Sequence, residues 1–167
     1  MKQMTKANIE AAFAGESQAH MKYAVYAEKA EREGFAQIAK LFRAISFAEK
    51  VHASNHLRVL DKIQSTSANL QDAASGERYE VEEMYPAFEA VAQLQGEKAA
   101  LRSIHYAVEA EKIHEKMYTD ADKLASEKKD IPAANVYVCP VCGHTVIGDA
   151  PDECPVCGLK KEKYQKF

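Results

Sequence analysis

The chain has 167 residues, a net charge of −3 and a composition rich in Ala, Glu and Lys, with seven Gly and five Pro. This length fits one medium domain with a small appendage, and the composition favours helix. The sequence has no basic stripe with interleaved aromatic residues, which argues against nucleic-acid binding, and no apolar run of about 18 residues, which argues against a membrane span. The N-terminal MKQMTKANIE lacks the apolar core of a signal peptide. We therefore expect a cytoplasmic protein with no nucleic-acid or membrane partner.

Taken in chain order, the hydrophobic pattern predicts four long helices before a region of different composition. They are expected at residues 5–33, 35–63, 77–95 and 97–126. Gly34 and Gly96 stand where the first and third helices should end. The small polar stretch 65–76 is interpreted as a connection with at most one turn of helix, and Pro86 could bend the third helix.

The last part of the chain differs from the helical part in composition. Residues 127–135 are charged and contain Pro132, which is typical of a linker, and from Val136 onward short β-like runs alternate with Cys, Pro and Gly. We therefore predict two domains, residues 1–134 and residues 135–167.

The pentapeptide AEKVH at residues 48–52 is nearly repeated as AEKIH at residues 110–114. Residues three apart lie on one face of a helix, so each copy presents a carboxylate and an imidazole together. Chance can produce two such spacings, so the pentapeptides alone are weak evidence. Their distance from the helix ends decides the interpretation.

Glu49 and Glu111 each lie 15 residues after a glycine, Gly34 and Gly96 respectively. Three other carboxylates lie 18, 19 and 16 residues before one of these glycines: Glu16, Glu77 and Glu80. A rise of about 1.5 Å per residue puts all of them roughly 22–28 Å from their turn, so they should be nearly level. A single Glu on an amphipathic helix is usually solvated, but level carboxylates on four helices are not explained that way.

One Glu from each of two helices, plus Glu-x-x-His from each of two others, is the ligand set of ferritin-like di-iron proteins. The candidate ligands here are Glu16, Glu49, His52, Glu77, Glu80, Glu111 and His114. Iron accepts carboxylate oxygen with imidazole as companion, whereas neighbouring carboxylates without a cation repel one another. Tyr23 and Tyr85 lie near the same level and either fill the core or hydrogen-bond to a ligand carboxylate.

All four cysteines lie in the last 30 residues, in two CPVCG units: Cys139, Cys142, Cys154 and Cys157. Each unit can form a knuckle in which two thiolates bind one metal ion and the glycine lets the backbone turn. Such a pair more often holds structural zinc, whereas iron in the same cage can carry one electron. A redox-active di-iron site needs an electron source, so the helical region favours iron.

Several stretches together resemble the rubrerythrin family across nearly the whole chain. They are AFAGESQAH (12–20), FAEKVH (47–52), GERYEVEEMYP (76–86), EAEKIH (109–114) and the paired CPVCG units. The resemblance implies a mainly α fold class: a ferritin-like four-helix bundle over residues 1–134, with a small C-terminal rubredoxin-like four-cysteine metal domain over residues 135–167.

The resemblance also implies individual roles. An oxo- and carboxylate-bridged di-iron centre would be held by Glu16, Glu49, Glu77, Glu80, Glu111 and His114, with Glu49 and Glu111 bridging. His52 would replace Glu80 as a ligand on reduction. Tyr23 and Tyr85 would hydrogen-bond to ligand carboxylates, and the four cysteines would hold one iron. The residues expected to take part in catalysis are Glu16, Glu49, His52, Glu80, Glu111, Tyr23 and Tyr85.

The implied activity is reduction of hydrogen peroxide to water, as protection against oxidative stress. An external donor, such as rubredoxin or an NAD(P)H-dependent reductase, would supply electrons through the thiolate-bound iron. A homodimer or tetramer is expected, commonly with the rubredoxin-like domain of one subunit serving the di-iron site of another. Two alternatives stay open: a ferritin-like ferroxidase or iron-binding protein, and a zinc-ribbon interaction module on a structural bundle.

Overall fold

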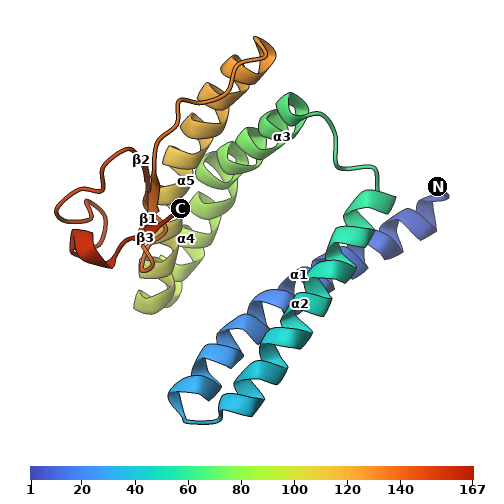
Figure 1. Ribbon diagram of the computed structural model, residues 1–167, viewed down its shortest axis with the longest axis horizontal. Coiled ribbons are helices and arrows are strands. Elements are labelled where there is room, and N and C mark those ends of the chain that lie inside the picture. Colours follow the sequence, from blue (N-terminus) through green and yellow to red (C-terminus); the bar gives the residue numbers. More distant parts are fainter. The chain divides into compact units, whose positions relative to one another are not determined.

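The computed structural model describes residues 1–167, which divide into two compact units, residues 1–64 and residues 65–167 (Figure 1). The first unit consists of α1 (Gln3–Arg32) and α2 (Ala36–Val59). The second contains α3 (Thr66–Tyr79), the π-helix η1 (Glu80–Met84), α4 (Tyr85–Gln95), α5 (Lys98–Ser126) and the four-cysteine region. No helix combines the length and apolar character that crossing a membrane requires.

The first unit is an antiparallel helical hairpin (Figure 1). Gly34 has a φ of 85°, the left-handed conformation that ends a helix and that glycine adopts most readily. Small buried side chains let the two helices approach closely: Ala27, Ala30, Ala39, Ser46 and Ala53. The predicted helices are confirmed, although α2 ends at Val59, four residues before its predicted end.

The interpretation of residues 65–76 as a connection is wrong, because α3 begins at Thr66. Ser65 caps this helix, since its hydroxyl accepts a hydrogen bond from the backbone N–H of Ala68 at 3.3 Å. Tertiary contacts then hold a segment of modest helix propensity in place. Gln71 donates to Asp122 on α5 at 2.9 Å, and Ser67 also donates to Asp122. The connection between α2 and α3 is therefore only the stretch 60–65.

The predicted third helix continues from α3 through η1 into α4, and its irregularity lies just before Pro86. Proline has no N–H to complete an α-helical hydrogen bond, so the ladder is interrupted at this point. The backbone N–H of Tyr85 instead reaches the carbonyl of Glu80, five residues back. The predicted bend is thus realised as one π-helical turn that begins at a candidate ligand.

The helix α5 runs back along α3 and α4 after a left-handed turn at Gly96, which has a φ of 71° (Figure 1). After it, residues 136–166 form a small antiparallel sheet of order β2-β1-β3, made of β1 (Val136–Val138), β2 (Thr145–Ile147) and β3 (Gln165–Lys166). A 3-10 helix, η2 (Lys161–Lys163), precedes β3. The buried core of this region consists of three cysteines with Ala150 and Tyr164.

Candidate metal centres

The first unit carries one carboxylate–imidazole group. Glu16 on α1 and Glu49 and His52 on α2 offer donor atoms that all lie within 4.8 Å of one another. His52 Nδ1 lies 3.1 Å from Glu49 Oε2 and 3.9 Å from Glu16 Oε1. The equal level of Glu16 and Glu49 predicted from their distance to Gly34 is therefore confirmed.

The two carboxyl groups of this cluster act on each other. A hydrogen bond with Glu49, then burial and the charge of Glu49, raise the pKa of Glu16. Hydrogen bonds from Glu16 and His52 lower the pKa of Glu49. The two carboxyl groups therefore influence each other's ionisation, and a cation bound between them would favour the ionised form of both.

The second unit carries the matching group, formed by Glu77 on α3 and by Glu111 and His114 on α5. His114 Nδ1 lies 2.6 Å from Glu111 Oε2. Burial, followed by the charge and hydrogen bond of Glu111, raises the pKa of Glu77 from 4.5 to about 7. Carboxylates crowded in this way repel one another, and a bound cation would remove the repulsion.

The two pentapeptides adopt the same internal geometry, since each histidine turns Nδ1 toward the glutamate three residues before it. Their environments differ, however. The His52 side chain is 54% exposed, whereas that of His114 is 27% exposed. His114 also has a second partner, because its Nε2 lies 2.8 Å from Thr145 Oγ1 on β2. One imidazole is therefore held on both sides and the other on one side only.

Glu80 begins the π-helical turn and Tyr85 follows it, and both lie near the second group without joining its closest cluster. Burial and the charge of Glu111 raise the pKa of Glu80. Burial, then the charges of Glu80, Glu111 and Glu77, raises the pKa of Tyr85, so its phenol keeps its proton. Both side chains thus lie close enough to the carboxylates to feel their charge.

Tyr23 has a different setting from Tyr85. Its ring centroid lies 6.2 Å from those of Tyr26 and Phe42, in an aromatic cluster between α1 and α2. Nearby, the buried Ser46 hydroxyl donates to the His20 carbonyl at 2.8 Å, and His20 Nδ1 lies 2.9 Å from the Ser46 carbonyl. These contacts fix the two helices at the level of Glu16, one turn from His20.

The four cysteines converge from two equivalent knuckles. Cys139 Sγ lies 3.5 Å from Cys157 Sγ, and Cys142 Sγ lies 3.4 Å from Cys154 Sγ. In each knuckle a glycine at positive φ donates its N–H to the carbonyl of the first cysteine, at 2.9 Å for both Gly143 and Gly158. A metal–sulfur bond of about 2.3 Å gives a tetrahedral edge of about 3.8 Å, so the four sulfurs need only a small expansion to hold one ion.

The thiols of this cluster differ in acidity. Burial raises the pKa of Cys142 and outweighs the backbone hydrogen bond from His144. Burial would also raise the pKa of Cys154, but hydrogen bonds from Tyr164 and from the backbone N–H groups of Cys157 and Val156 lower it to about 6. One thiolate therefore forms readily, and the others need a cation to displace their protons.

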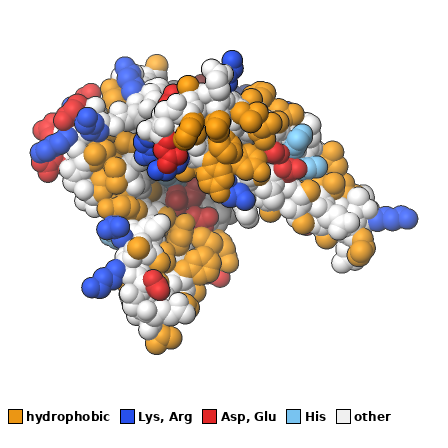
Figure 2. All heavy atoms as spheres, turned by 90° about the horizontal axis from the view of Figure 1, so that it is seen from below, with side chains coloured by type: hydrophobic (Ala, Val, Ile, Leu, Met, Phe, Trp, Pro, Cys, Tyr) orange, Lys and Arg blue, Asp and Glu red, His pale blue; other side chains and the backbone are white.

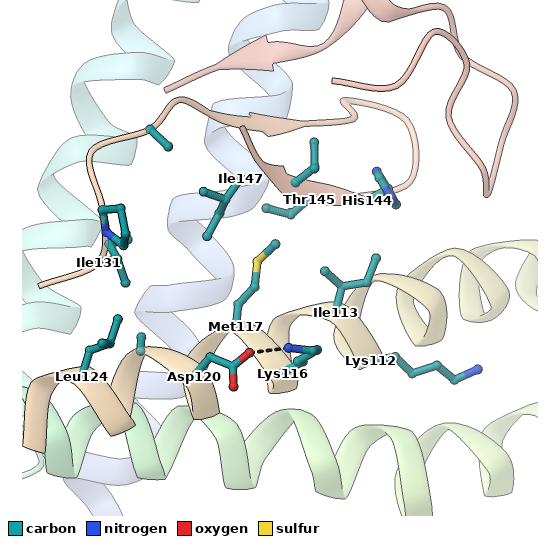
Figure 3. A pocket seen from close by; sticks show the side chains of 14 residues that line it. Lys112, Ile113, Lys116, Met117, Asp120, Leu124, Ile131, His144, Thr145 and Ile147 are labelled. Atoms are coloured by element: carbon teal, nitrogen blue, oxygen red, sulfur yellow. Dashed lines mark hydrogen bonds and ion pairs between the residues drawn. The ribbon is translucent and has the colours of Figure 1, made fainter. Parts of the chain in front are cut away.

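The four-cysteine domain packs on α5 of the same chain. Tyr106 contacts its buried cluster. An apolar cleft of about 690 Å³ lies between β2 and the part of α5 from Lys112 to Leu124. In Figure 3, Thr145 and Ile147 line one side of this cleft and Met117 the other. Sequence reasoning did not identify Thr145, because no pattern within the chain connects it to His114.

Comparison with known proteins identifies the family. The model of the family described as "Rubrerythrin" matches residues 7–121, and that described as "Rubrerythrin, rubredoxin-like domain" matches residues 137–165. The chain belongs to the rubrerythrin family. It is 43% identical over 178 residues to Rubrerythrin-2 of Clostridium acetobutylicum, covering 98% of this chain and 97% of the relative. It is 32% identical to Nigerythrin of Nitratidesulfovibrio vulgaris, covering 98% of this chain and 86% of the relative.

Solved structures support the same family and fold class. The structure titled "Fully reduced state of nigerythrin (all ferrous)" matches with a TM-score of 0.59 at 31% identity, covering 98% of this chain and 86% of that one. The predicted mainly α ferritin-like fold with a C-terminal rubredoxin-like domain is thereby confirmed. The cofactors of the rubrerythrin family, a di-iron centre and one iron on four thiolates, fit the donor sets found here: two carboxylate–imidazole groups and a tetrathiolate cluster.

Proposed function

We propose that the protein is a non-haem di-iron peroxidase that reduces hydrogen peroxide to water and so protects against oxidative stress. One hydrogen peroxide, two electrons and two protons give two water molecules. The observation that carries this proposal is the packing of the four-cysteine cluster against Tyr106 of α5, the helix that also bears Glu111 and His114. A one-electron carrier beside a di-iron ligand helix is the arrangement that repeated two-electron reduction requires.

The residues of the chain have separate tasks in this reaction. The irons, when bound, supply electrons and a Lewis-acid site for the peroxide oxygens. The carboxylates hold them and balance their charge. Tyr85 keeps its phenolic proton, so it can donate a hydrogen bond to a ligand carboxylate and help to orient it. An external electron donor of the rubredoxin or NAD(P)H-dependent reductase class would dock at the exposed Val141, which adjoins Cys142.

The proposed di-iron ligands are the residues named from the sequence: Glu16, Glu49, Glu77, Glu80, Glu111 and His114. Glu49 and Glu111 are proposed as the bridging carboxylates, and His52 as the ligand that replaces Glu80 on reduction. The unequal setting of the two imidazoles supports this exchange, since His52 is largely exposed while His114 is held on both ring nitrogens.

Three further features belong to the same proposal. The domain boundary lies at 134/135, which is supported by the start of β1 at Val136.

A homodimer or tetramer is supported by the exposed apolar residues Ile38, Leu41 and Ile45 along α2. Hydrophobic side chains also form contiguous patches on the face drawn in Figure 2. A cytoplasmic location is supported by four thiols gathered as metal ligands, since a reducing compartment preserves them.

An anaerobic titration of the reduced iron-loaded protein with hydrogen peroxide tests the proposal. We expect rapid oxidation of both iron sites, with peroxide consumption equal to half the electrons released. C142S should lose the visible absorption of the thiolate-bound iron and retain only a single oxidation of the di-iron site. D149N, at an exposed residue of the same domain, is the matched control and should turn over normally. Normal turnover by C142S would refute the electron route, and iron oxidation by dioxygen without peroxide reduction would favour a ferroxidase instead.

A further inference from the structure

Three residues of α5 form a stripe that faces the four-cysteine domain. Tyr106, Ala110 and His114 follow one another at intervals of four, so they lie on one face of the helix. Tyr106 packs against the cysteine cluster, and His114 hydrogen-bonds to Thr145. The domain is therefore seated along the same helical face that carries a candidate iron ligand.

The middle residue of the stripe permits this close approach. Ala110 is buried, and a Cβ atom placed on Gly143 would lie 3.4 Å from its Cβ. Gly143 has a φ of 80° and directly follows Cys142, so the knuckle backbone itself rests on the helix. A small residue on each side of the contact brings Thr145 within hydrogen-bond distance of His114.

The hydrogen bonds around Thr145 have a defined direction. Its hydroxyl donates to the Gly143 carbonyl at 2.9 Å, so toward His114 the same oxygen can only accept. The Nε2 of His114 must then carry the hydrogen, so Nδ1 of the neutral ring is an acceptor, and its 2.6 Å hydrogen bond with Glu111 Oε2 requires the proton on that carboxyl group. Thr145 is 9% exposed and is one of two buried polar side chains, so water competes little for these bonds.

We propose that Thr145 is a positioning residue that holds the His114 ring with Nδ1 free for iron and provides the electron entry from the Cys142 knuckle of the same chain. This inference rests on the proposed function. The route runs from Cys142 through the Gly143 carbonyl and the Thr145 hydroxyl to the His114 ring. With iron held by the four cysteines and by the carboxylate–imidazole groups, each step would pass one electron from the thiolate-bound iron, ferrous becoming ferric, to the di-iron centre. No covalent bond is made or broken, and the external carrier later restores the ferrous state.

Three variants separate the hydrogen bond from the packing. T145V keeps the shape of the side chain and removes the hydroxyl, T145S keeps the hydroxyl, and I147V alters packing in the same cleft without touching the bridge. The first readout is the tautomer of His114, from nitrogen NMR of the full-length chain with zinc on its thiolates. Wild type, T145S and I147V should hold the hydrogen on Nε2, and T145V should populate both tautomers.

The second readout is electron transfer in the iron-loaded protein. After reduced protein is mixed with peroxide, T145V should oxidise its di-iron site at the wild-type rate. Its thiolate-bound iron should follow about 10- to 100-fold more slowly, the usual size of an effect from a residue behind a metal ligand. T145S should restore the rate. An unchanged rate in T145V, or an equal loss in I147V, overturns the proposal. If wild type does not react with peroxide, the proposed function fails, and the tautomer alone decides the positioning role of Thr145.

Discussion

Replacing Glu77 with Gln should remove much of the pH dependence of stability in the metal-free protein. The folded protein keeps a proton on Glu77 up to about pH 7, because burial and Glu111 raise its pKa from 4.5 to about 7. The unfolded chain releases that proton near pH 4.5, so it binds fewer protons across this window. Stability therefore falls as the pH rises from 4.5 to 7.

The size of the fall follows from the same pKa. About 1.4 kcal/mol per pH unit gives at most about 3 kcal/mol, and partial exposure of Glu77 reduces this to between about 1 and 3 kcal/mol. For a chain of this length, such a change lowers the melting temperature by about 3 to 10 °C. Bound metal should reverse the trend, because the ion replaces the proton and binds better as the pH rises.

Thermal unfolding of chelator-treated protein, followed by circular dichroism from acid to neutral pH, measures this effect. E77Q should show a clearly flatter profile than wild type. E109Q is the matched control, because a hydrogen bond from Lys112 lowers the pKa of Glu109. It should retain the wild-type fall. Parallel profiles for wild type and E77Q would show that Glu77 ionises freely, and the crowding of carboxylates at α5 would then be refuted.

Three further changes test the fold around the sites. S46A should destabilise the protein by about 1–2 kcal/mol in denaturant titration, because the buried bond to His20 is lost, whereas S54A on the exposed face should change little; equal values would contradict the role of the buried bond. G96A should cost about 1–2 kcal/mol in the same assay, because its φ of 71° is left-handed, and a neutral result would contradict that conformation. Removing iron from the thiolates should abolish the near-ultraviolet circular dichroism of Tyr164, since the small core depends on the metal; a retained signal would show that the domain folds without it.

The sequence was sufficient for the parts of the site that depend on local geometry. Helical rise and two helix-ending glycines put Glu16 level with Glu49, and the Glu-x-x-His spacing put each imidazole beside its carboxylate. The paired CPVCG units specified the tetrathiolate cluster for the same reason. In each case the interacting groups are separated by a known number of residues along regular structure.

Other features depend on contacts that no local pattern encodes. The stretch 65–76 has the small polar residues of a connection, yet α3 is stabilised by its cap and by hydrogen bonds to Asp122, 51 residues further along than Gln71. The contact between His114 and Thr145 depends on how the linker returns the chain to α5. The π-helical form of the bend before Pro86 likewise depends on which backbone N–H group pairs with each carbonyl, as Tyr85 does with Glu80.

That π-helical turn also determines where the chain tolerates a change in length. Eight residues separate Glu77 from Tyr85, and at about 100° per residue a regular helix would turn them about 80° apart. A π turn absorbs about one residue, which brings the two side chains to within about 20° of each other. A single-residue deletion inside Glu80–Met84 should therefore restore a regular helix while Glu77 and Tyr85 still face the same way. The same deletion elsewhere between them would swing Tyr85 away from the carboxylates, so insertions and deletions in this helix should be confined to η1.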